Sequence, residues 1–105
     1  MNISTYENTL QVFDLAKLTA ENAAEVRNGV RAELKPHHKL LKIDFSNIEF
    51  LDSSGLGVLI ALQQTICEQD GRIQIYHPNP TSQQILELTR LHRIFELIIP
   101  PSEES

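Results

Sequence analysis

The sequence lacks several features that would place it in a common functional class. Among its 105 residues there is no tryptophan, and the single cysteine, Cys67, excludes an internal disulfide. The chain carries 9 Lys and Arg against 14 Asp and Glu, a net charge of -5, and its basic residues are scattered. This balance argues against nucleic acid as a partner and favours another protein.

Long apolar runs are also absent. The longest covers residues 56–62, far short of the roughly 20 residues that a membrane-spanning helix needs. The first four residues lack the basic start of a signal peptide. We therefore expect a cytoplasmic protein with no membrane association. A chain of this length has room for one hydrophobic core, so we expect a single domain over residues 1–105, with a frayed tail from about residue 100.

Stretches with strand periodicity alternate with stretches of helical periodicity. A hairpin is predicted first, followed by three more strands, over residues 1–6, 9–15, 39–45, 72–76 and 95–99. Helices are predicted between them, from a cap at Thr19 to Pro36, from about residue 54 to 69, and from residue 81 onward. The alternation predicts an α/β fold: a mixed, mostly parallel sheet with helices packed mainly on one face.

The pattern also gives more local predictions. Residues 81–84 predict a capping box for the third helix, whose inner face should carry Ile85, Leu88 and Leu91. Cys67 is predicted to be a small buried residue. The four histidines have no zinc-site spacing and are predicted to be solvated loop residues.

The central stretch, residues 52–57, follows a strand and opens a helix. Ser53 or Ser54 is expected to cap that helix, which leaves at least one hydroxyl free, while Asp52 places negative charge beside the helix start and orients the loop. Gly55 and Gly57 lower helix propensity, which suggests that they leave the backbone uncovered for a close approach. Sites in parallel sheets lie at the carboxyl ends of strands, where this turn falls.

The same residues offer little support for catalysis. Asp52 stands two residues before Ser54, where the nucleophile elbow of a hydrolase has glycine, and no histidine has a triad context. The two central glycines lack the third glycine of a dinucleotide loop. Asp44 and Asp52 lack the further acid or lysine that a metal or phosphoryl site needs. We expect no catalytic residue, no metal and no cofactor.

Residues 48–59, which read IEFLDSSGLGVL, resemble the signature of STAS domains of the bacterial anti-sigma factor antagonist type. The likeness extends to residues 41–45, 71–75 and 85–91 and to Phe95. The family usually has a glycine where this chain has Arg90, and it usually ends in a further helix. The resemblance implies that Ser54 is a phosphoacceptor and that a partner contacts Asp52, Ser53, Ser54, Gly55, Leu56 and Gly57.

Three functions remain open at this point. The resemblance implies an anti-sigma factor antagonist that, unphosphorylated, binds an anti-sigma factor serine/threonine kinase and releases a sigma factor, with a phosphoserine phosphatase reversing the switch. The second is a STAS module that serves as scaffold or regulator in another signalling or transport-associated complex. The third, an enzyme with Ser54 as nucleophile, is disfavoured by the missing catalytic partners.

Overall fold

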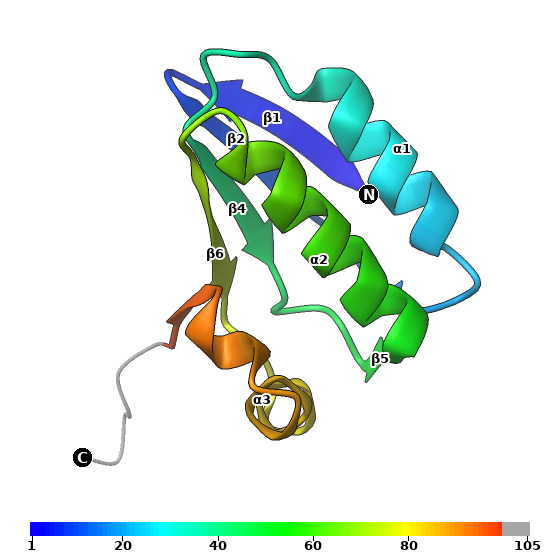
Figure 1. The fold of residues 1–105 in the computed structure, drawn as a ribbon. Coiled ribbons are helices and arrows are strands. Elements are labelled where there is room, and N and C mark those ends of the chain that lie inside the picture. Colours follow the sequence, from blue (N-terminus) through cyan, green and yellow to red (C-terminus); the bar gives the residue numbers. More distant parts are fainter. Residues whose placement is uncertain (100–105) are drawn as a thin grey trace.

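Five strands form the main sheet in the computed structural model, which describes residues 1–99 (Figure 1). Their order across the sheet is β1-β2-β4-β6-β7. Their bounds are Asn2–Tyr6 for β1, Thr9–Phe13 for β2, Leu40–Asp44 for β4, Arg72–Tyr76 for β6 and Glu96–Ile98 for β7. Only β1 and β2 pair antiparallel, and the other neighbours are parallel. The predicted mixed sheet, with the hairpin at one side, is confirmed.

Helices connect the parallel strands. Their bounds are Ala23–Glu33 for α1, Ser53–Cys67 for α2 and Pro80–Leu88 for α3, and a short 3-10 helix, η1, spans Leu91–Arg93. Figure 1 shows α1 and α2 side by side across one face of the sheet, with α3 beyond the end of β6. Each helix was predicted, with ends that differ by a few residues.

The core lies between the sheet and the pair α1 and α2. Alternate residues of β2 and β4 point into it, while their neighbours on the opposite face are polar or half-buried. From the helices it receives Val26, Val30, Val58, Leu59, Leu62 and Ile66. The alternation fixes the register, because a slip by one residue would turn every apolar strand residue to the other face.

A second, two-stranded sheet was missed by the sequence prediction. Strand β3 (Lys17–Leu18) pairs parallel with β5 (Phe50–Leu51). The Glu49 N–H also donates to the Ala16 carbonyl oxygen at 2.9 Å. Strands of two residues are too short to produce a period, although this pair joins the segment before α1 to the segment before α2.

The predicted caps of α1 and α3 were wrong. The residue before α1 is Asn22, and the Thr19 hydroxyl instead accepts a bond from the Glu21 N–H at 3.3 Å. For α3 the cap is Asn79, whose Oδ1 accepts from the Ser82 N–H at 2.7 Å. Pro80 suits the first turn because it has no N–H to satisfy.

Two burial predictions also fail. Leu88 is 75% exposed, whereas Leu86 is fully buried. Cys67 is exposed, and its sulfur accepts a bond from the Gln63 amide at 3.0 Å. In each case the buried residue sits one or two positions away, a rotation that the few apolar residues of a short helical turn do not specify.

His38 corrects the expectation of solvated histidines, because its side chain is fully buried. Arg90, where the resemblance led us to note a missing glycine, has a φ of 63°. That left-handed conformation is one that glycine adopts without steric cost, which explains the preference for glycine at this position. The expected frayed tail from residue 100 lies outside the described residues.

Candidate functional site at the amino end of α2

Asp52 caps α2 and also connects the start of this helix to the segment that follows β3. Its Oδ1 accepts from the Gly55 N–H at 3.0 Å, and its Oδ2 accepts from the Ala20 N–H at 3.1 Å. These backbone bonds hold the pKa of the Asp52 carboxyl below its usual range, because they favour the charged form. The expectation that a serine caps this helix was therefore wrong. Asp52 does orient the loop.

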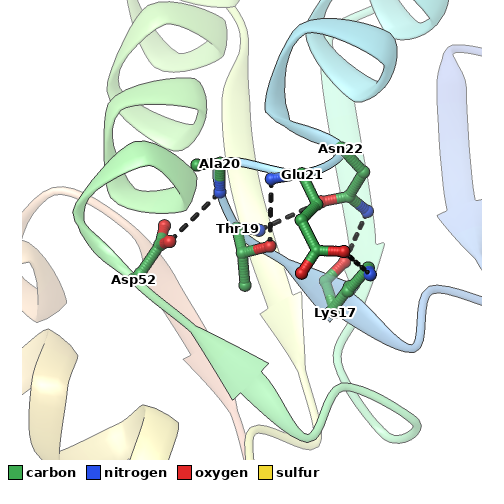
Figure 2. A network of polar contacts seen from close by, with 6 residues as sticks. All are labelled: Lys17, Thr19, Ala20, Glu21, Asn22 and Asp52. Carbon is green, nitrogen blue, oxygen red and sulfur yellow. Dashed lines mark hydrogen bonds and ion pairs between the residues drawn. The ribbon is translucent and has the colours of Figure 1, made fainter.

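The segment tied by Asp52 has its own polar network (Figure 2). Asn22 Oδ1 accepts from the Thr19 N–H at 3.0 Å, and its amide donates to the Lys17 carbonyl oxygen at 2.8 Å. Lys17 Nζ also lies 2.6 Å from a Glu21 carboxylate oxygen. The segment from Lys17 to Asn22 is thus held in one conformation beside the start of α2.

Ser53 and Ser54 occupy the first turn of α2, and both are exposed. Because Asp52 performs the capping, neither hydroxyl has a hydrogen-bond partner within residues 1–99. The prediction that at least one hydroxyl is spare is confirmed, and both are. A group added to either oxygen would meet the positive end of the helix dipole. Their assignment as phosphoacceptor and partner contact stays a prediction.

The two glycines of this turn play different parts. A Cβ on Gly55 would lie 2.0 Å from the Leu18 carbonyl oxygen, so the close approach comes from β3 of the same chain. This corrects the expectation that Gly55 leaves its backbone uncovered. A Cβ on Gly57 would meet no atom within 4 Å, and this residue is exposed. Leu56, between them, is half-buried against the core.

A hollow of about 410 Å³ lies beside the Asp52 cap. The residues that line it are Lys17, Thr19, Ala20, Glu21, Phe50 and Asp52. Phe50 is 63% exposed there. Sequence reasoning missed Phe50, because its position depends on the β3–β5 pair. Its only signal was an aromatic residue directly before the central motif.

Two kinds of arrangement are not found among residues 1–99. No group of three or more His, Cys, Asp or Glu side chains is placed to hold a metal ion. None of the helices in this part of the chain is long and apolar enough to cross a membrane.

The family model described as "Mlab, STAS domain" matches residues 15–100. The chain belongs to the STAS domain family. Over 89 residues it is 30% identical to a candidate anti-sigma factor antagonist of Thermotoga maritima, an alignment that covers 83% of this chain and 78% of the relative. The match contains the site at the amino end of α2 and every element from β3 to β7.

Solved structures of anti-sigma factor antagonists have the same fold. A crystal structure of a candidate anti-sigma factor antagonist from Thermotoga maritima superposes with a TM-score of 0.84 at 24% identity, covering 98% of this STAS domain and 89% of that chain. The anti-sigma factor antagonist SpoIIAA in its unphosphorylated form gives 0.72 at 16% identity, with the same coverage of 98% and 89%. The Bacillus SpoIIAA in its phosphorylated form gives 0.68 at 18% identity, covering 98% and 92%.

Proposed function

We propose that this STAS domain is an anti-sigma factor antagonist that works as a phosphorylation-controlled binding switch. Unphosphorylated, it binds an anti-sigma factor serine/threonine kinase and frees a sigma factor; the kinase phosphorylates Ser54, and a phosphoserine phosphatase restores the binding form. The observation that carries the proposal is the pair of exposed hydroxyls at the start of α2, which have no hydrogen-bond partner among residues 1–99 because Asp52 caps the helix.

The partner contacts proposed are Asp52, Ser53, Ser54, Gly55, Leu56 and Gly57. Their parts are unequal. Asp52 and Gly55 hold the turn in place from within the chain, through the cap and through the contact with Leu18. Ser54 and Gly57 face solvent with free space around them, so they offer the surface that a kinase active site can reach.

In this proposal the domain is a substrate of the kinase and does not itself catalyse a reaction. Phosphoryl transfer needs Mg²⁺, a phosphate-binding loop and a residue that orients the nucleophile, all of which a kinase brings. Both oxygens of Asp52 are already engaged by backbone N–H groups, which disfavours it as a base for Ser54. Relatives named anti-sigma factor antagonists support a regulatory role for this chain.

The test is phosphorylation by the cognate kinase with ATP, followed by peptide mapping. We expect one phosphate, on Ser54, and none on Ser53, Thr81 or Ser82. Ser54→Ala should abolish the modification, and Ser53→Ala should keep it. Phosphate that maps reproducibly to Ser53, or none after incubation with the kinase, would contradict the assignment.

A second candidate is a STAS module in another signalling or transport-associated complex. It is favoured by the family model itself, whose description names Mlab and no anti-sigma factor antagonist. Affinity capture from the native cytosol with and without ATP, read by mass spectrometry of the bait and its partners, separates the two. An ATP-dependent partner that leaves a phosphate on the bait supports the switch, and a transport ATPase captured without phosphorylation supports the second candidate.

A further inference from the structure

A second hollow lies on the sheet, among residues that the switch does not use. It has a volume of about 180 Å³ and is lined by Gln11, Lys42, Asp44, Tyr76 and His77. These residues come from β2, from β4, and from β6 and the residue that follows it. Leu10, Val12, Leu41 and Ile43 point into the core, so the alternating Gln11, Lys42 and Asp44 belong to the opposite face.

Strand pairing fixes the arrangement of the lining. Gln11 is the cross-strand partner of Lys42, and Asp44 is the cross-strand partner of Tyr76. Lys42 and Asp44 are two positions apart on β4, which separates their Cα atoms by about 7 Å. The hollow is therefore bordered by one ammonium and one carboxylate on a rigid strand, with a flanking amide, phenol and imidazole.

The two charges do not satisfy each other. No ion pair joins Lys42 to Asp44 in the described part of the chain, where the pairs are Lys17 with Glu21 and Arg72 with Glu96. Lys42 Nζ instead lies 4.5 Å from the centre of the Tyr76 ring. Asp44 accepts one bond, through Oδ1 from the Ser46 N–H at 2.9 Å, and its Oδ2 accepts none within residues 1–99. A cation and an anion, two positions apart on the same face of β4, thus remain available in the lining of one hollow.

The other polar side chains of the lining provide hydrogen-bonding groups. Neither the Gln11 amide nor the His77 ring makes a hydrogen bond to another side chain or to the backbone of residues 1–99. The Tyr76 hydroxyl donates to Gln74 Oε1 at 2.9 Å, which holds the ring under Lys42. His77 has a φ of 56°, a conformation uncommon for a residue with a side chain and one that recurs at binding sites.

Size and charge together select the ligand class. At about 180 Å³ the hollow is smaller than the roughly 300 to 1,000 Å³ of sites for drug-sized molecules. Simple phosphate or sulfate is disfavoured by the Asp44 carboxylate, and a metal ion by the presence of a single carboxylate beside an ammonium. A small molecule that carries one negative and one positive group can pair with both Lys42 and Asp44.

We propose that this hollow binds a free α-amino acid. The ligand carboxylate pairs with Lys42, and its ammonium pairs with Asp44. The Gln11 amide and the His77 ring lie within the same lining and bond the remaining ligand oxygens. The site is distinct from the amino end of α2, shares none of its residues, and stands or falls independently of the proposed switch.

The test is an NMR titration of the ¹⁵N-labelled protein with glycine, the other common L-amino acids, acetate, methylammonium and a dipeptide. We expect saturable shifts at Gln11, Lys42, Asp44, Tyr76 and His77 with at least one amino acid. Acetate, methylammonium and the dipeptide should bind at least tenfold more weakly. Loss of one charged contact is expected to cost about tenfold or more, so Lys42→Met and Asp44→Asn should each lower affinity by that factor.

The matched control is Arg31→Met, which removes an exposed cation from α1, outside the lining of the hollow, and should leave amino acid affinity unchanged. Thermal melts of all three variants show whether each is folded. Absence of saturable shifts with every amino acid would overturn the proposal. Equal binding of acetate would reduce the site to an anion contact and would also overturn it, as would a loss in Arg31→Met equal to that in Lys42→Met. None of these results depends on phosphorylation of Ser54.

Discussion

The two ends of α2 are held in opposite ways. At the amino end the cap comes from the preceding residue, Asp52, and the next two side chains are free in solvent. At the carboxyl end, the Gln69 amide donates to the carbonyl oxygens of Lys35 and His38, both at 2.7 Å. Lys39 Nζ also donates to the Gln69 carbonyl oxygen at 2.6 Å.

The difference suggests a division of labour along one helix. Contacts to residues about thirty positions away in sequence fix the carboxyl end, so that α2 keeps its place on the sheet. The amino end is tied to β3 and the segment after it through the Asp52 carboxylate and the close contact of Gly55 with Leu18, and it leaves the Ser53 and Ser54 side chains exposed. A partner can therefore bind there, or a phosphate can be added, without disturbing what anchors the helix.

The largest effect is expected from Gly55→Ala, which breaks the one tight contact of the amino end. The new Cβ would lie 2.0 Å from a backbone oxygen of β3 that cannot move without opening the β3–β5 pair. We expect a loss of about 3 kcal/mol or more in the free energy of unfolding, measured by urea denaturation.

Gly57→Ala is the matched control, because its Cβ meets open space. It should raise the free energy of unfolding by up to about 1 kcal/mol through helix propensity. Equal stability of the two variants would show that the contact between Gly55 and Leu18 does not constrain this end.

At the carboxyl end, Gln69→Ala removes the donor shared by two carbonyl groups. We expect a loss of about 1 to 2 kcal/mol in the free energy of unfolding, since two hydrogen bonds are lost, an exposed one to Lys35 and a partly buried one to His38. Gln64→Ala, on the exposed side of α2, should change the free energy of unfolding by less than about 0.5 kcal/mol. Binding of the kinase partner should be the same in both variants, and a loss specific to Gln69→Ala would contradict the division of labour.

A smaller effect is expected from pH, through His38. Its Nδ1 accepts from the Lys35 N–H at 2.8 Å, so the neutral ring carries its proton on Nε2, which is buried and has no hydrogen-bond partner within residues 1–99. Burial, with the neighbouring His37 and Lys35, holds the pKa of His38 below its ordinary 6.5. The unfolded chain then binds more protons than the folded chain just below pH 6.5, so stability falls as pH falls through this window.

Urea denaturation at a series of pH values measures this slope. His38→Asn keeps an acceptor near the position of Nδ1 but cannot titrate, so the slope below about pH 6.5 should flatten. His37→Asn, at an exposed position, should keep most of it, because burial is the larger cause of the lowered pKa of His38 and His37 the smaller one. Asp52 also loses its stabilising charge as pH falls, but only in the more acidic range below its unfolded pKa. An unchanged slope in His38→Asn would show that the carboxyl end is not the source of the pH dependence.

The fold could be predicted from the sequence because the apolar patterns of the main strands and helices extend over several residues. Strands β2 and β4 alternate strictly, and α2 is apolar over several turns, so the parallel sheet and its two covering helices followed. Strands β3 and β5 could not be predicted, since a strand of two residues is too short to show an alternating pattern. Leu86 and Leu88 could not be told apart, because both lie in a helix of only nine residues.

The sequence placed residues 52–57 at the start of a helix, but it did not show what each side chain does there. A run of Asp, Ser and Ser allows three different caps, and only the distances from Asp52 to Gly55 and Ala20 decide among them. Gly55 was predicted to leave its backbone uncovered for a close approach, but the sequence could not say that the approaching atom is the Leu18 carbonyl oxygen of the same chain. The burial of His38 could not be predicted, because it depends on packing against distant residues such as Gln69, and such contacts leave no local sequence pattern.

The central claim is that a charge on Ser54 ends partner binding without unfolding the domain. A phosphoserine adds about -1.5 to -2 charges at pH 7, at a helix start that tolerates negative charge. A partner covering Leu56 and Gly57 would have to bury that charge beside Asp52, which is costly.

Calorimetric titration of the cognate kinase with Ser54→Asp and Ser54→Ala, together with thermal melts, measures this most directly. Gln64→Glu, which adds the same charge further along α2, is the control. We predict that Ser54→Ala and Gln64→Glu bind and that Ser54→Asp binds at least tenfold more weakly, with a Tm close to that of the parent. Binding of Ser54→Asp as tight as that of Ser54→Ala, or a loss of affinity that comes with unfolding, would contradict the account.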